Sequence, residues 1–306
     1  MRDKGRGPAK AVCLLLLSAL VVLACPQMAD ASVPKSEAAP VRPPTYTPPG
    51  NAIVSPTFPA YFSVADKSAG MSYDKNGIPM VAYYGVLKYN PVTIEEVALF
   101  DYNQWKAYGS TTAKLTFFQL ADWLVDNQTS DGLWLYNFAF QEQPVPWWSG
   151  MAQGVGISVL VRAYSQTLKP AYQLAAANAL ATFTRPTSRR GVTSNDNGTW
   201  YEEYLPPDHL HVLNGMIFAM MGLLDYSQEF HDSLSSSLWS TGATTLVNNL
   251  HRFDTGKWSY YDCAKRVASI DYHKLHIFLL GTMYSLTGMH TFNDYRARFQ
   301  AYLGNG

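Results

Sequence analysis

The segment Trp200–Tyr226, WYEEYLPPDHLHVLNGMIFAMMGLLDY, decides how the fold of this chain is interpreted. It begins with two glutamates flanked by tyrosines, passes through a Pro-Pro turn and enters a long run of small and apolar residues. Prolines do not continue a helix, whereas the run after Leu210 has the length and apolar content of a buried one. The segment therefore predicts a polar loop held by a rigid helix, an arrangement in which the loop typically carries function.

Outward from this segment, the chain from Pro91 onward alternates between helical patterns and loops. Helices are expected at Thr93–Tyr108, Thr112–Asn127, Met151–Gln166, Pro170–Phe183, Leu210–Phe230, Asp232–His251, His273–Thr287 and Asn293–Leu303. They fall into pairs, which indicates α-hairpins curling around a common centre. The loops Trp134–Ser149, Arg185–Pro207 and Phe253–Tyr272 are long and aromatic, and loops of that length are usually functional.

Several helix starts carry recognisable capping residues. Thr93 and Glu96 have the spacing of a capping box, and Ser149 precedes a helix whose first turns are rich in glycine. Those glycines would let another helix or a ligand approach closely. Just before them, Trp147 and Trp148 are candidates for stacking on sugar rings, although packing accounts for one of them equally well.

The first 90 residues differ in composition from the rest. Residues 1–31 combine a basic start, the apolar run Ala11–Ala24 and small residues at a cleavage site, which predicts a secretory signal peptide. The apolar run is short for a transmembrane helix. A lipid-anchored N-terminus at Cys25 is the alternative, and both interpretations predict export to the periplasm or the extracellular space. Residues 32–60 form a Pro-rich linker, and residues 61–90 predict a short β-hairpin segment.

Bulk properties narrow the class of partner. The 306 residues carry a formal net charge of zero, which argues against a nucleic-acid partner. Without residues 1–31 a single cysteine, Cys263, remains, so the core rather than a disulfide must stabilise the fold. Cys263 is expected to be a small buried residue rather than a nucleophile. Nothing in the pattern indicates an oligomeric state.

Two segments place tyrosines beside charged groups. In Tyr201-Glu202-Glu203-Tyr204 a carboxylate can hold a neighbouring phenol ready as proton donor or acceptor, and the alternative is a strand edge with exposed glutamates. Farther on, Tyr261 precedes Lys265 and Arg266. Nearby cations favour the phenolate form, so this tyrosine is a candidate base, and the alternative is a hairpin with surface charges.

The segment Asp271–His276 supplies a further tyrosine at a helix start. Asp271 is expected to cap the helix, which leaves Tyr272 facing the mouth of the helix ring. His273 and His276 share one helix face, but no third ligand stands at a convincing spacing. No metal site is therefore predicted.

Taken together and in order, PWWSGMAQGVGISVLVRAY, the segment Trp200–Tyr226, YYDC and DYHKLHIFLL resemble the C-terminal catalytic domain of D-glucuronyl C5-epimerases. The resemblance covers about residues 91–303. Enzymes of this family convert D-glucuronate to L-iduronate within heparan-type polymers. The resemblance implies a mainly α fold, an incomplete α/α toroid over residues 91–306 with its active site at the loop end. It also implies a uronate-containing polysaccharide as substrate, tyrosine-mediated proton transfer at C5, and no cofactor.

Carried over by position, the family's catalytic residues fall on Glu203, Tyr204, Tyr261 and Tyr272. The side chains expected to bind substrate are Trp148, Gln153, Arg189, Arg190, Asn214, Lys265, Arg266 and His273. The chain departs from the family where a Leu-Arg pair becomes Cys263-Ala264, and we expect Lys265 or Arg266 to replace the missing arginine. The large N-terminal β-region of the animal enzymes has no counterpart beyond residues 61–90.

Three other functions fit parts of the pattern. A polysaccharide lyase would use the same C5 carbanion to expel the C4 substituent, and many such enzymes share the fold and a tyrosine base. A glycoside hydrolase would pair Glu202 or Glu203 with Asp262 or Asp271. A catalytically inactive carbohydrate-binding protein would explain the missing arginine. The products distinguish them: an unsaturated uronate, a new reducing end, or no change.

Overall fold

The computed structural model of the chain describes residues 71–205 and 210–304. The expected signal peptide, the Pro-rich linker and the first part of the β segment lie outside the described residues. Within the described part the chain is mostly helical, with short strands before and between the helices.

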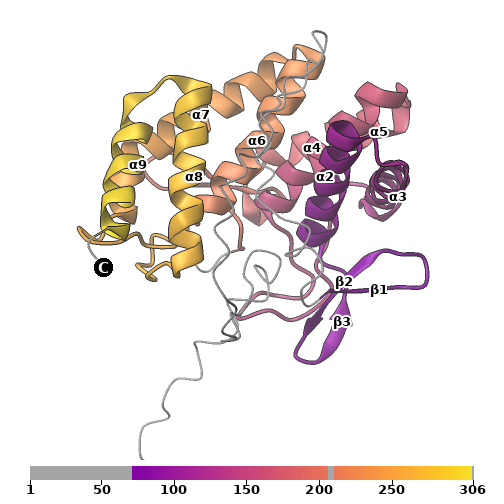
Figure 1. Cartoon of the computed structure of the whole chain (residues 1–306), viewed down its shortest axis with the longest axis horizontal. Coiled ribbons are helices and arrows are strands. Elements are labelled where there is room, and N and C mark those ends of the chain that lie inside the picture. The colour runs from indigo at the N-terminus through magenta and orange to yellow at the C-terminus, as the bar shows by residue number, and fades with distance from the viewer. Residues whose placement is uncertain (1–70, 206–209, 305–306) are drawn as a thin grey trace, which may run out of the picture.

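Eight of the described helices form four successive hairpins. The inner helices are α2 (Pro91–Tyr108), α4 (Gly150–Thr167), α6 (Leu213–Phe230) and α8 (Ile270–Thr287), and each packs on the next. Each is followed by its outer partner: α3 (Thr111–Asn127), α5 (Pro170–Ala181), α7 (Ser233–Asn249) and α9 (His290–Leu303). Figure 1 shows these pairs along an arc that runs from α2 and α3 to α8 and α9. The predicted pairing is confirmed, and the fold is an incomplete toroid of α-hairpins.

The helix starts correct two of the predicted caps. The capping box at Thr93 and Glu96 is wrong: the Asn90 side chain accepts a hydrogen bond from the Thr93 N–H at 3.3 Å, and Pro91 occupies the first turn. Proline there needs no hydrogen-bond partner for its nitrogen, so α2 begins earlier than expected. Asp271 is likewise not the cap of α8, because Ser269 accepts from the backbone N–H three residues later.

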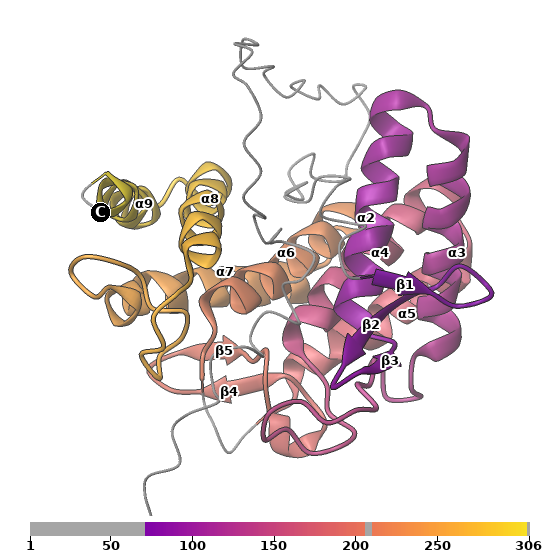
Figure 2. The ribbon, with the colours of Figure 1, turned by 60° about the horizontal axis from the view of Figure 1, so that its bottom comes forward.

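Short strands form two small antiparallel sheets outside the helices. Strands β1 (Met71–Tyr73), β2 (Pro79–Tyr83) and β3 (Val86–Lys88) form an antiparallel sheet in that order. Figure 2 shows this sheet beside the start of α2. Strands β4 (Thr193–Asn195) and β5 (Thr199–Tyr201) form a hairpin inside the long loop before α6. The predicted β-hairpin segment is confirmed for its described residues.

The core is densest where α4 crosses α6. A Cβ added at Gly154 would lie 2.3 Å from the Ala219 carbonyl oxygen, and one at Gly222 would lie 2.0 Å from that of Gly154. Only glycine permits such an approach. Ser149 caps α4 as predicted. Of the glycines that follow it, Gly154 serves the contact with α6.

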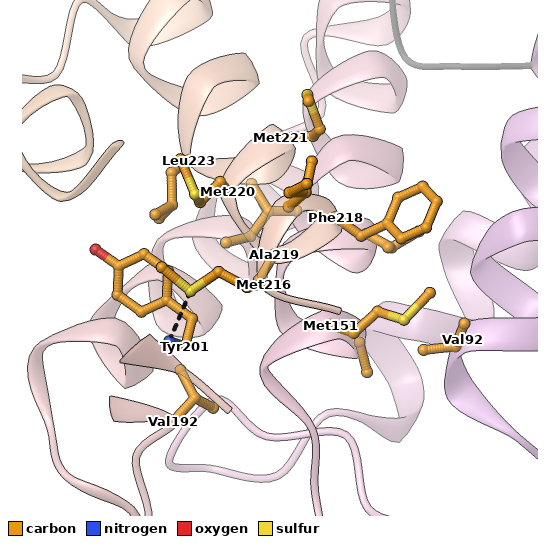
Figure 3. Close-up of a cluster of buried hydrophobic side chains, with 14 of the residues drawn as sticks. Val92, Met151, Val192, Tyr201, Met216, Phe218, Ala219, Met220, Met221 and Leu223 are labelled. Atoms are coloured by element: carbon orange, nitrogen blue, oxygen red, sulfur yellow. Dashed lines mark hydrogen bonds between the residues drawn. The ribbon is translucent and has the colours of Figure 1, made fainter. Parts of the chain in front are cut away.

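Polar contacts tie the apolar core together at two points. Arg162 of α4 and Asp225 of α6 form a buried ion pair at 2.5 Å. Closer to the loop end, the Tyr201 N–H donates to the sulfur of Met216, a contact drawn among the buried methionines in Figure 3. Removing either partner of a buried ion pair is costly, so these two helices are fixed relative to each other.

Gly222→Ala tests the α4–α6 contact against Gly281→Ala, a matched substitution within α8. The first forces a methyl group onto a backbone carbonyl and is expected to lower the free energy of unfolding by about 1–3 kcal/mol. The second meets only the flexible Arg296 side chain, 3.1 Å away, and should gain up to about 1 kcal/mol from helix propensity. Chemical denaturation measures both. Equal effects would contradict the close contact.

Candidate active site

The site lies on the face of the toroid at which the inner helices begin. Each outer helix returns the chain, so the four inner helices run in one direction and their N-termini gather at the same end. The loops that precede α4, α6 and α8 lie there too. Helix N-termini present unpaired N–H groups and positive partial charge, which favours anionic groups at this end of the molecule.

Backbone hydrogen bonds fix these loops to the helix starts. The Gly150 N–H at the start of α4 donates to the Glu202 carbonyl at 2.6 Å. At the start of α6, the Leu213 N–H donates to the Tyr261 carbonyl at 3.3 Å. Gly215 leaves room for the Glu203 side chain, because a Cβ there would lie 2.2 Å from its carboxylate oxygen. The first turn of α6 therefore positions both Glu203 and Tyr261.

The structure brings together Glu203, Tyr204, Tyr261 and Tyr272 from three separate segments. All four side chains are buried. The Tyr261 hydroxyl lies 3.4 Å from the Glu203 carboxylate and also hydrogen-bonds with Tyr204 and Tyr272. The Tyr261 and Tyr272 rings meet edge to face with centroids 4.6 Å apart. The four groups form one hydrogen-bonded cluster, here called the tyrosine cluster.

Burial sets the protonation of the tyrosine cluster. It raises the pKa of the Glu203 carboxyl to about 7, despite hydrogen bonds from Tyr204 and Tyr261 and attraction by Arg266, which act to lower it. Burial, reinforced by the Glu203 carboxylate, raises the pKa of all three phenols well above the ordinary value. The tyrosines are therefore neutral at neutral pH, and Glu203 titrates close to it.

Arg266 is the cation nearest the cluster among the described residues. Its guanidinium lies over the Tyr261 ring, 5.3 Å from the centroid, and forms an ion pair with the buried Asp262. One guanidinium nitrogen, Nη2, is buried without a hydrogen-bond partner among the described residues. Lys265, the other candidate for the missing arginine, is exposed in a left-handed turn with φ of 66°. The geometry favours Arg266.

Two further acids, which sequence reasoning missed, lie on α2. Glu95 is fully buried with neither carboxyl oxygen hydrogen-bonded to a described residue, and Glu96 is 8% exposed. Burial raises the pKa of both carboxyls well above the ordinary range. Repulsion by Glu96 raises the pKa of Glu95 further, and repulsion by Glu203 does the same for Glu96. The available signal was a pair of glutamates inside an otherwise apolar helical segment, VTIEEVALF.

Glu202, adjacent to Glu203, belongs to a different group. Its carboxylate lies 2.8 Å from Nδ1 of His211, whose Nε2 lies 3.1 Å from Asp196. His211 is buried and stacks on Trp200 with ring centroids 4.4 Å apart. These contacts clamp the β4–β5 hairpin to the entrance of α6, so Glu202 supports the loop that carries Glu203.

Two of the predicted substrate-binding residues, Gln153 and His273, are buried and hydrogen-bonded to other parts of the fold. Gln153 is fully buried; its oxygen accepts from the Trp134 N–H at 3.1 Å, and its nitrogen donates to the Gly132 carbonyl at 2.6 Å. His273 is also fully buried, with Nδ1 2.8 Å from the Ser259 hydroxyl and Nε2 2.9 Å from the Phe299 carbonyl. Their positions favour bracing of the loops over contact with a ligand.

Other predicted residues lie just before α4, on the loop before the β4–β5 hairpin or at the start of α6. The half-buried Trp148 donates to the Gly191 carbonyl at 2.7 Å, and Arg190 covers its ring at 5.1 Å while pairing with Asp131. Arg189 is exposed on the same loop. Asn214 is buried beside Gly215, and its Oδ1 has no hydrogen-bond partner among the described residues. Asn214 is thus adjacent in sequence to Gly215, which contacts the Glu203 side chain.

Neither a metal centre nor a thiol nucleophile is indicated. Within residues 71–205 and 210–304 no three His, Cys, Asp or Glu side chains gather as metal ligands would. Burial raises the pKa of Cys263 to about 12, so its thiol stays protonated.

None of the helices in the described part of the chain is long and apolar enough to cross a membrane.

Comparison with known proteins connects this arrangement to one family. The family model described as D-glucuronyl C5-epimerase C-terminus matches residues 127–301. The D-glucuronyl C5-epimerase of Caenorhabditis elegans is 36% identical over 190 residues, 54% of this chain and 31% of that protein. An uncharacterised protein of Methanocaldococcus jannaschii is 26% identical over 175 residues, 55% of this chain and 57% of that protein. The match spans less than two thirds of either relative.

Solved structures confirm the fold. The unsaturated glucuronyl hydrolase of Bacillus sp. GL1, described as responsible for the degradation of glycosaminoglycan, matches with a TM-score of 0.52 and 16% identity. A UGL structure with dGlcA-Glc-Rha-Glc gives 0.51, also at 16% identity. Both matches cover 70% of this chain and 62% of the other. The chain therefore has an incomplete α/α toroid fold, as predicted.

Glu203→Gln tests the buried carboxyl through stability. In the unfolded chain Glu203 loses its proton near 4.5, whereas in the folded protein it keeps the proton up to about 7. The folded state thus loses stability as pH rises through this window, by about 3 kcal/mol at about 1.4 kcal/mol per unit. The Gln variant should lack this loss, measured by denaturant unfolding across the window. The exposed Glu142→Gln is the control, and an unchanged pH dependence in Glu203→Gln would contradict the assignment.

Proposed function

Because the chain belongs to the D-glucuronyl C5-epimerase C-terminal family, we propose that it converts D-glucuronate to L-iduronate residues within a polysaccharide. The observation that carries the proposal is the buried tyrosine cluster with Arg266 at its edge. It offers proton-transfer groups from separate loops around one point, as inversion at a carbon atom requires. No described group in the cluster suggests redox chemistry.

The reaction is limited by charge. Removing the C5 proton of a uronate pushes electrons into a carboxylate that is already negative, so the site must stabilise a second negative charge as it develops. Arg266 has a guanidinium nitrogen free to meet that carboxylate. The gathered helix N-termini add positive partial charge at the same end of the toroid.

The pKa values in the tyrosine cluster indicate which group accepts the proton. A resting phenolate is costly here because burial and Glu203 both raise the pKa of the tyrosines. Glu203, with a pKa of about 7, is the group that can accept a proton at neutral pH. In the proposed step Tyr204 takes the C5 proton while passing its own hydroxyl proton to Glu203. Glu203 is the base, and the tyrosine relays to it.

Reprotonation from the opposite face completes the inversion. Tyr261 or Tyr272 donates its hydroxyl proton to C5, and the electron pair returns from the carboxylate to the new C–H bond. Glu203 hydrogen-bonds with both Tyr204 and Tyr261, so the proton it received can return to the phenol that gave one up. Each cycle then leaves the cluster in its starting state, and no proton is consumed.

A hydrolase has less support than an epimerase, whereas a lyase is distinguished only by its product. A hydrolase needs two free carboxylates across the sugar, but Glu202 is held by His211 and Asp262 by Arg266. A lyase uses the same cluster and differs only in whether the C4 substituent leaves. The proposed substrate is a uronate-containing polysaccharide. The match covers 31% of the Caenorhabditis elegans epimerase, so the identity of its polymer is not carried over to this chain. Export remains a prediction from residues outside the described part.

Incubation with desulfated heparosan-type polymer in deuterated water tests the proposal. Deuterium at C5 together with iduronate signals in NMR is the expected result for the wild type. Tyr204→Phe should reduce this exchange by about 100-fold or more while the circular dichroism and unfolding transition stay unchanged. An ultraviolet-absorbing product would identify a lyase, and new reducing ends a hydrolase. Full activity in Tyr204→Phe would remove that tyrosine from the mechanism.

Arg266→Gln tests the cation through the pH profile. Glu203 is active as the carboxylate, so exchange should rise as pH passes through about 7. Arg266 lowers the pKa of Glu203 by attraction, so its removal should move the midpoint of this rise to higher pH. Loss of carboxylate binding should also lower kcat/KM by about 10- to 100-fold. Lys265→Gln is the matched control, and a larger effect there would assign carboxylate binding to Lys265 instead.

A further inference from the structure

A second buried hydrogen-bonded group adjoins two of the tyrosines along the chain. The Ser259 hydroxyl lies 2.8 Å from Nδ1 of His273 and 3.0 Å from Nδ1 of His276, and all three side chains are fully buried. Ser259 comes two residues before Tyr261, and His273 directly follows Tyr272. These three residues, here called the serine–histidine network, therefore join the loop that carries one tyrosine to the helix that carries the other.

The hydrogen bonds of the serine–histidine network fix the position of each proton. The Ser259 backbone N–H donates to His273 Nδ1 at 3.2 Å, so this nitrogen carries no proton. Nε2 of His273 lies 2.9 Å from the Phe299 carbonyl and is the protonated nitrogen that donates to it. The Ser259 hydroxyl then donates to His273 as well, and it accepts from the Nδ1–H of His276. Donation therefore runs from His276 through Ser259 to a neutral His273 and on to α9.

His276 is neutral for a different reason. With its proton on Nδ1, its Nε2 is an acceptor, and this atom is buried without a hydrogen-bond partner among the described residues. A second proton there would bury a positive charge and a donor that nothing described accepts. In agreement with this geometry, burial lowers the pKa of His273, and burial and repulsion by His273 lower the pKa of His276 to about 3.

Burial argues against a nucleophilic role for Ser259, although a serine beside a histidine is a common catalytic pair. Its hydroxyl is shared between two imidazoles and has no exposed surface. Trp258 lies flat over His273 with ring centroids 3.8 Å apart, and its indole N–H donates to the Ala268 carbonyl at 2.8 Å. The Ala268 N–H in turn donates to the Ser259 carbonyl at 3.0 Å. The network is thus enclosed by its own loop, which suits a role in position rather than in bond making.

The backbone of the loop transmits the position of Ser259 to Tyr261. Both side chains are buried, whereas Tyr260 between them is partly exposed and pairs with Val267 in an antiparallel bridge. Successive side chains alternate between two faces in backbone paired in this way. Ser259 and Tyr261 therefore project to the same side, where both contact residues of α8.

Two successive turns of α8 hold Ser259. His273 lies in the first turn of this helix and His276 in the second. A serine bonded to both turns cannot slide along the helix axis without breaking one of the two bonds. Tyr272 lies in the first turn as well, and its ring meets that of Tyr261 with centroids 4.6 Å apart. The network therefore holds the two phenols in one relative position.

On the basis of the proposed epimerase function, we propose that the serine–histidine network positions Tyr261 on the face of the sugar opposite Tyr204. Removal of the C5 proton by Tyr204 and Glu203 does not depend on the network, because both residues lie on the loop before α6. Return of a proton from the opposite face does depend on it. The network touches no substrate and keeps its own protons, but it sets whether the carbanion is reprotonated to iduronate or returns to glucuronate.

Ser259→Ala tests the proposal through two products formed in deuterated water. It removes the hydroxyl and keeps the backbone N–H that donates to His273. Iduronate formation should fall about 10- to 100-fold in kcat with KM unchanged, because a reacting group displaced by about 1 Å loses up to about 100-fold in rate. Deuterium entering glucuronate at C5 should fall less than about 3-fold, since Tyr204 exchanges it from its own face. Equal losses of both signals, or no loss of iduronate, would overturn the proposal.

Ser235→Ala is the matched control. Ser235 is also fully buried, and its hydroxyl donates to the Asp232 carbonyl at 3.1 Å, but it lies at the start of the outer helix α7. Both variants lose one hydrogen bond from a buried serine, so their unfolding transitions should shift by similar amounts. Both product signals of Ser235→Ala should equal those of the wild type. A fall in iduronate alone in this variant would mean that the product ratio does not report on Tyr261.

Two substitutions of His276 separate the hydrogen bond from the volume of the ring. Asn places an amide N–H near the position of the Nδ1–H, so His276→Asn should keep iduronate formation within about 3-fold of the wild type. Leu fills much of the same space without a donor, so His276→Leu should form deuterated glucuronate in excess over iduronate, as Ser259→Ala does. Equal product ratios in the two His276 variants would overturn the proposal.

NMR tests the network without turnover. Nitrogen-15 spectra at pH 7 should show His273 protonated on Nε2 and His276 protonated on Nδ1, and a charged ring or the reverse tautomers would overturn the proposal. Nuclear Overhauser contacts between the Tyr261 and Tyr272 rings should be present in the wild type and weakened in Ser259→Ala; unchanged contacts would overturn it too. If the wild type shows no C5 exchange, the proposed function fails, and the hold of the network on the two tyrosines stands or falls with these contacts.

Discussion

The contact between Glu203 and the first turn of α6 is the constraint on which the site depends. The carboxylate fits there because Gly215 has no Cβ, which would otherwise stand 2.2 Å from a carboxylate oxygen. The same turn binds the Tyr261 backbone through Leu213. Since α6 is itself fixed against α4 by glycine contacts and a buried ion pair, the position of the proton-transfer groups is set by the packing of the core. The loops carry the chemistry, but two helices determine where it occurs.

Electrostatics gives the site its reactivity and works against stability. Glu95, Glu96 and Glu203 are all buried, and Arg266 attracts the Glu203 carboxylate. Such a group of acids destabilises the folded chain unless some remain protonated. The same condition supplies Glu203 as a base that titrates near neutral pH. Functional sites commonly retain this type of local destabilisation because the surrounding structure supports it.

Much of the fold and part of the site were predictable from the sequence. The apolar runs of α4 and α6 and the Gly-rich start after Ser149 indicate paired helices directly, because periodicity and capping are local properties. The resemblance to the family implies that the tyrosines at positions 204, 261 and 272 act together, and the structure places them in contact. Their catalytic roles remain predictions.

What the sequence did not reveal depends on contacts between distant segments. Glu96 was assigned to a capping box, because local spacing cannot show that Asn90 and Pro91 already begin the helix. The chain bends at Glu203 just after β5, and Glu202 contacts His211 whereas Glu203 contacts the tyrosines. His273 stands next to Tyr272 but turns toward Ser259 and Phe299, a direction set by the packing of α9.

The central claim is that Glu203 and its tyrosines transfer protons as one unit, and a double-mutant cycle on C5 deuterium exchange tests it most directly. Groups that act as a unit lose their function together, so Tyr204→Phe combined with Glu203→Gln should be no slower than the slower single variant. Losses that multiply in the double variant would mean that the carboxylate and the phenol act independently, and would contradict the relay.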